Sequence, residues 1–221
     1  MSQSLTLMWH MIFQHNEKFY FCAQTGLKIM IETKNKYIIK TYQNNEIKIQ
    51  FKKLDVSTNE ILAYLSPEEF NSYCKTGCPN YNQKWTCPPN CPPFIDYAKN
   101  YPKLNLYLFY TSPNQFDFIS QKDRSLTAYN FIKEELQSYL SEIEPVNGKM
   151  IAANSCEICK ICALIKGNQC HIPEKVRYNL VAFGFNVSKI MSDLFQHKIK
   201  WAKQNEPSEY VSSVGAILKE E

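Results

Sequence analysis

The sequence predicts an α+β fold, a single compact domain in which a mixed sheet with flanking helices carries two cysteine-rich metal-binding loops. Short alternating runs predict strands, one long stretch repeats apolar residues at helical spacing, and eight of nine cysteines fall in two groups between such elements. Apolar residues make up 44% of the 221 residues, which is enough for a sizeable core. We assign residues 37–221 to the cysteine-rich α+β metal-binding domain and residues 1–36 to an N-terminal extension packed on it.

The first elements of this domain are expected to be a hairpin and a short helix. Two alternating runs within residues 37–51 meet at Asn44-Asn45, which indicates a hairpin turn. Ser66 followed by a proline and by Glu69 predicts a helix that opens with a capping box and runs into the first cysteine group. Alternation over residues 104–110 then predicts a strand, and apolar spacing over 123–143 predicts a long helix.

The remaining elements surround the second cysteine group. Residues 149–153 predict a short strand that leads directly into this group. Pro173 is expected to open a short helix that Gly184 closes. A last long helix is expected from Val187 to Trp201, followed by a final strand over residues 210–218.

Composition excludes several function classes. The net charge of +4 is mild and spread along the chain, so no nucleic-acid stripe is indicated. The short apolar run near the N-terminus has no Lys or Arg before it and is neither a signal peptide nor a membrane span, so we expect a cytoplasmic protein. Cytoplasmic cysteines are usually reduced, and nine of them therefore point to metal or redox chemistry rather than to disulfides. No glycine-rich nucleotide loop and no radical-SAM motif is present in the sequence.

The second cysteine group has the more specific spacing. Cys156, Cys159 and Cys162 form C-x-x-C-x-x-C, and Cys170 follows after Gly167, which could turn the loop back. Ferredoxin-type [4Fe–4S] loops use the same tight triple with a further cysteine near a proline. Zinc is the competing interpretation, although structural zinc more often takes two separated C-x-x-C pairs.

The first group has looser spacing, C-x3-C-x8-C-x3-C. Its members are Cys74, Cys78, Cys87 and Cys91. This spacing separates an iron–sulfur cluster from zinc less clearly. Tyr81 and Trp85 would either shield a cluster from water or serve as ordinary core aromatics.

Other candidates carry less information. Cys22 is expected to be a buried strand cysteine, and His171, next to Cys170, is either a ligand or a polar loop residue. Four basic residues surround the second group and would either steer an acidic electron-transfer partner or form a solvated face. They are Lys160, Lys166, Lys175 and Arg177.

The cysteine segments resemble those of the domain-of-unknown-function family 2284, whose members are described as predicted metal-binding proteins. The matching segments are CKTGCPNY, WTCPPNCPP, CEICKIC, CHIPEKVR and GFNV, within roughly residues 70–190. In the family pattern the position of Cys91 is not reliably a cysteine. The resemblance therefore implies that Cys74, Cys78 and Cys87 are the core ligands of the first site.

These observations favour an iron–sulfur protein with two [4Fe–4S] clusters, one held by each cysteine group. Its expected role is electron transfer to a redox partner protein, or reductive activation of a partner enzyme, with no nucleic acid or membrane involved. One alternative is an enzyme for redox or sulfur chemistry at an open iron of the first cluster. The other is an interaction module stabilised by zinc, the alternative metal.

Overall fold

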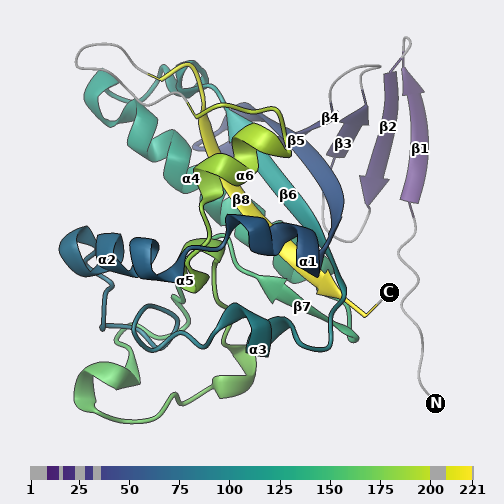
Figure 1. Cartoon of the computed structure of the whole chain (residues 1–221). Coiled ribbons are helices and arrows are strands. Elements are labelled where there is room, and N and C mark those ends of the chain that lie inside the picture. Colours follow the sequence, from purple (N-terminus) through teal and green to yellow (C-terminus); the bar gives the residue numbers. More distant parts are fainter. Residues whose placement is uncertain (1–8, 15–16, 23–27, 32–35, 200–207, 221) are drawn as a thin grey trace.

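One antiparallel sheet organises the fold. A computed structural model describes residues 9–14, 17–22, 28–31, 36–199 and 208–220. Within these ranges eight strands are hydrogen-bonded in the order β1-β2-β3-β4-β5-β6-β8-β7, and every neighbouring pair is antiparallel (Figure 1). The strands are β1 Trp9–Gln14, β2 Glu17–Cys22, β3 Lys28–Ile31, β4 Lys36–Tyr42, β5 Asn45–Ser57, β6 Lys103–Thr111, β7 Gly148–Ile151 and β8 Val211–Lys219.

The predicted hairpin is confirmed, with its turn at Gln43 and Asn44. Both residues have positive φ, 47° and 66°, which matches the right-handed twist of the two strands that follow and precede them. The Asn45 side chain donates to the Gln43 carbonyl at 2.9 Å and closes the turn.

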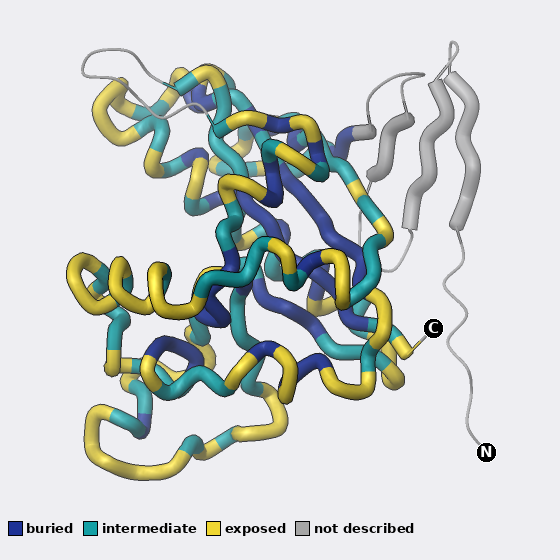
Figure 2. Tube along the Cα trace, viewed as in Figure 1, coloured by how far each residue is buried: buried dark blue, intermediate teal, exposed yellow. Residues whose placement is uncertain are grey.

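Helices cover both faces of the sheet, so the central strand β6 is buried on both sides. Its even-numbered leucines, Leu104, Leu106 and Leu108, pack in one core cluster with the short helices. Its odd-numbered Tyr107 and Phe109 pack in a second cluster under α4. Figure 2 shows this buried centre as a dark band through the sheet. The described helices are α1 Thr58–Ile61, α2 Pro67–Gly77, α3 Phe94–Ala98, α4 Gln121–Ile143, α5 Leu180–Phe183 and α6 Val187–Asp193, with short 3₁₀ turns at Leu62–Tyr64, Pro113–Phe116, Ala163–Lys166 and Pro173–Lys175.

Most predicted elements are confirmed, including the α+β class, the strands β6, β7 and β8 and the long helix α4. The sheet was predicted to be mixed, but all pairs among the described strands are antiparallel. The capping box is not where the sequence pattern placed it. Ser66 makes no side-chain cap bond, because its segment is held in another way: Leu65 bridges to Phe185 and the Ser66 N–H donates to the Gly184 carbonyl. A capping box does form at the start of α1, between Ser57 and Glu60.

The helix expected between Pro173 and Gly184 is divided in two. Residues between the Pro173–Lys175 turn and α5 are extended because the Tyr178 carbonyl accepts from the Ala152 N–H at 2.8 Å, just beyond β7. Gly184, at φ 95°, ends α5 as predicted.

The last predicted helix, α6, is shorter than expected. It ends at Asp193, and Gln196 at φ 51° prevents its continuation; Trp201 lies outside the described residues. None of the described helices is long and apolar enough to cross a membrane. The boundary drawn at residue 36 remains a prediction.

Candidate metal centre

The first cysteine group lies at the end of α2 and in the loop that follows. Cys74 is in the last turn of α2, and the Cys78 N–H donates to its carbonyl at 3.1 Å as the helix ends. Cys87 is buried in a loop that folds back on itself, because the Asn82 N–H donates to the Pro88 carbonyl at 2.8 Å. This local folding brings together thiols that are up to thirteen positions apart in the sequence.

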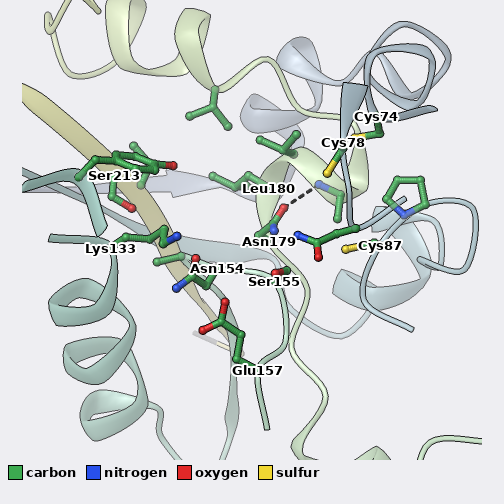
Figure 3. Close-up of a pocket in the computed structure, with 18 of the residues that line it drawn as sticks. Cys74, Cys78, Cys87, Lys133, Asn154, Ser155, Glu157, Asn179, Leu180 and Ser213 are labelled. Atoms are coloured by element: carbon green, nitrogen blue, oxygen red, sulfur yellow. Dashed lines mark hydrogen bonds between the residues drawn. The ribbon is translucent and has the colours of Figure 1, made fainter. Parts of the chain in front are cut away.

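Three thiols of this group face one cavity of about 310 Å³. Cys74, Cys78 and Cys87 line one wall, whereas Cys91 is not among the lining residues. Cys91 instead packs beside the core cluster under α3 and contacts the Pro92 carbonyl at 3.5 Å. Figure 3 shows the sulfurs of Cys78 and Cys87 on the side of the cavity opposite the α4 helix. The three core ligands implied by the family resemblance are therefore the three that share a cavity.

The opposite wall of this cavity is polar. Lys133 reaches it from α4, and other polar residues come from the segment before the second cysteine group (Figure 3). These are Asn154, Ser155 and Glu157, together with Asn179 and Ser213. No carboxylate of the described residues lies within ion-pair distance of the Lys133 ammonium, which makes only a 3.4 Å contact with Asn130 and lies 5.4 Å from the Tyr129 ring centroid.

The second cysteine group surrounds a separate cavity of about 500 Å³, and all four of its thiols line it. After Cys162 the chain makes a 3₁₀ turn, and Gly167 at φ 71° reverses its direction, as its position in the sequence predicted. Cys170 is thereby returned to the cavity wall that holds Cys156. The rest of the wall is largely apolar, with Ile158, Ile161, Ile165 and Ile172.

Burial keeps several of these thiols protonated when no cation is bound. It raises the pKa of Cys91 to about 12, and it also raises the pKa values of Cys74, Cys87 and Cys156. For all four, the negative charge of neighbouring thiolates in the same group raises the pKa further, and for Cys91 this neighbour is Cys87. A bound cation reverses this effect, so metal binding at either group would release protons.

Segments 84–86 and 155–168 connect the two groups. The Lys84 ammonium donates to the Ser155 hydroxyl at 3.1 Å, and the Trp85 indole donates to the Asn168 carbonyl at 3.2 Å. The Thr86 hydroxyl accepts from the Cys156 N–H at 3.1 Å. The two predicted sites are thus neighbours, although 64 residues separate them in the sequence.

Several weaker candidates are also placed. Tyr81 lines the first cavity, whereas Trp85 and His171 line the second. Arg177 is turned away from the second group, because its guanidinium pairs with Glu144 at 2.6 Å. The side chain of Cys22 lies outside the described residues.

Sequence reasoning did not identify Thr86, Lys133 or Asn154 as site residues. Thr86 and Asn154 stand next to or near cysteines in the sequence, and that proximity is the only local signal they carry. Lys133 belongs to an amphipathic helix and is indistinguishable there from a solvated lysine. Only the tertiary fold brings it to the cavity.

The donor set consists of thiols, which are ligands for zinc and for iron–sulfur clusters alike. Across the described ranges, no three His, Cys, Asp or Glu side chains are already placed where they could hold one metal ion. The four thiols of the second group line a cavity of about 500 Å³.

Comparison with known families supports metal binding. The family model described as predicted metal-binding protein (DUF2284) matches residues 56–218, a range that contains both cysteine groups. The chain belongs to the DUF2284 family. The DUF2284 match begins near the end of β5 and extends to β8, so it also contains α4 and the polar wall of the first cavity. No curated protein and no solved structure matches the chain.

Proposed function

We propose that this metal-binding protein carries two [4Fe–4S] clusters and transfers electrons to a partner, or reductively activates a partner enzyme. The observation that carries the proposal is the second cavity of about 500 Å³, which all four thiols of the tightly spaced second group line. Cys156, Cys159, Cys162 and Cys170 would hold one cluster. Cys74, Cys78 and Cys87 would hold the other, with Cys91 as the remaining candidate ligand.

A bound cluster of this type would supply one-electron transfer, with a potential set by burial and by hydrogen bonds to its sulfurs. The chain contributes the surroundings that set this potential. The isoleucines give the second cavity a partly apolar lining, and the Gly167 turn orients Cys170. Around the first group, burial raises the pKa of Cys87, and the adjacent Thr86 hydroxyl lowers it.

The partner would dock at the second site. Cys159 is exposed, and Ile158, Ile161 and Ile165 beside it expose 48%, 59% and 56% of their surface. Lys160 and Lys166 are exposed in the same loop. An apolar centre next to an exposed ligand and a cationic rim favours a partner with an acidic contact surface, and steering of this kind weakens as salt is added.

Low-temperature EPR of the reduced, anaerobically prepared protein tests the proposal. Two clusters give two reducible paramagnetic centres, and the signal of each disappears when one of the cysteines that line its own cavity is replaced. A protein that gives no such signal after reduction, and holds one zinc ion per group instead, is the zinc-stabilised interaction module.

A second candidate function is an enzyme that uses an open iron of the first cluster. The absence of Cys91 from the first cavity favours it, as does the polar wall with Lys133 opposite the three thiols. An ammonium group with no described carboxylate partner is suited to binding an anionic substrate. Small anions that change the EPR spectrum of the first cluster, and no longer do so in Lys133→Gln, would support this candidate over simple electron transfer.

A further inference from the structure

We infer that Thr86 couples the two cysteine groups, so that a metal held in one group stabilises the metal held in the other. This inference deepens the proposed function and rests on it only in requiring that both groups bind metal. The coupling residue lies where the two cavities meet. Thr86 lines the second cavity, and the next residue, Cys87, lines the first.

Thr86 touches both groups at once. It directly precedes Cys87 in the chain, and its hydroxyl accepts from the Cys156 N–H at 3.1 Å. With only 1% of its surface exposed, Thr86 has no water to replace this bond.

The neighbours of Thr86 hold it in this position. Lys84 and Trp85 also bond across to the second loop, at Ser155 and Asn168. Three consecutive residues therefore attach to three separate points of the loop that carries the second group. Thr86 is the connection that joins the two groups most directly, because it is bonded in the chain to Cys87 and its side chain contacts Cys156 itself. A shift of Cys87 on metal binding therefore moves Cys156 through Thr86.

Binding linkage makes such coupling reciprocal, which gives it a measurable form. Hydrogen-bonding neighbours of metal ligands typically change metal affinity by about 10- to 100-fold when they are removed. We therefore expect the loss of the first site to accelerate metal loss from the second by about tenfold, but only while the Thr86 hydroxyl is present.

A double-mutant cycle tests this expectation by measuring chelator-driven metal release from the second group. Cys78→Ser removes the first site, Thr86→Val removes the hydroxyl with little change in shape, and the two are combined. Each single variant is expected to speed release by about tenfold, and the double variant no more than either single. Thr86→Ser restores the hydroxyl and should release metal at the parental rate.

Thr111→Val is the matched control for the loss of a buried hydroxyl. Thr111, on β6, has 2% of its surface exposed, donates to the Lys48 carbonyl at 2.8 Å and lines neither cavity. It should leave metal release unchanged. If the Cys78→Ser and Thr86→Val effects multiply in the double variant, or if Thr111→Val acts like Thr86→Val, the coupling role of Thr86 is wrong.

A second test does not require Thr86→Val to fold. Native mass spectrometry counts the empty, half-loaded and fully loaded species when the parental protein and Thr86→Ser are partly loaded with metal. Coupled sites make the half-loaded species rarer than independent filling predicts, and independent sites give the statistical amount. The statistical amount in the parental protein would overturn the inference. Both tests follow metal release or occupancy, so they decide the inference even if the metal is zinc and the proposed iron–sulfur function fails.

Discussion

Replacing Cys91 by alanine tests whether Cys91 is a ligand of the first site or only packs near it. Cys74, Cys78 and Cys87 share the first cavity, and Cys91 does not line it. Cys91→Ala should therefore keep the first cluster, whereas Cys78→Ala should remove it. Of about eight irons in a two-cluster protein, we expect at least about seven to remain in Cys91→Ala and about four in Cys78→Ala.

The cost of Cys91→Ala to folding is expected to be small. Its sulfur packs beside the core that includes Phe94 and Tyr97, and losing one partly buried atom of this size costs about 1 kcal/mol. For a chain of this length that lowers the Tm by about 2–4 °C. Cys22→Ala provides a second reference and should leave both clusters intact.

Iron and acid-labile sulfide analysis of the variants, prepared side by side without oxygen, is the assay. EPR of the reduced samples shows whether the environment of the remaining first cluster has changed. If Cys91→Ala loses as much iron as Cys78→Ala, Cys91 is an obligatory ligand, and the open-iron enzyme loses its main support.

Three further predictions concern the second site, the loops and a buried histidine. Cys159→Ala should remove about half of the iron, because it deletes the middle of three ligands in one short loop; full retention would contradict the assignment. Metal removal should lower the Tm and expose residues 74–91 and 156–173 to protease, since these loops contain little regular structure; unchanged melting and cleavage would contradict a structural role. Burial, assisted by Lys52, lowers the pKa of His197 from 6.5 to about 4. The unfolded chain binds this proton at a higher pH than the folded chain does. His197 should therefore lower the free energy of unfolding by about 2 kcal/mol as the pH falls from 6.5 to 4, a value that allows for partial hydration of the imidazole. Urea unfolding of His197→Gln should show a correspondingly flatter dependence on pH, and an unchanged slope would refute the role of the imidazole.

Local patterns predicted the elements whose causes are local. The hairpin depends on Gln43 and Asn44 at positive φ, α4 on apolar spacing, and the end of α5 on Gly184. The capping box and the Pro173 helix were wrong for the opposite reason. Leu65 bridges to Phe185 and Ala152 bonds to Tyr178, and such distant pairings leave no trace in a short stretch of sequence.

The candidate site was also predictable only in part. Both cysteine groups were predicted from spacing, and the structure gathers three thiols of one and four of the other around cavities. The nearness of the two groups was not predictable, because it arises from contacts such as Thr86 with Cys156 across 70 positions. Lys133 was not predictable either, because the sequence of α4 shows only which residues face the core and not that Lys133 reaches the first cavity.

The content of iron, acid-labile sulfide and zinc in strictly anaerobic protein tests the central claim most directly. Two thiolate-ligated [4Fe–4S] clusters predict about eight irons and about eight sulfides per chain, with no stoichiometric zinc. One zinc ion per cysteine group and no sulfide would contradict the claim.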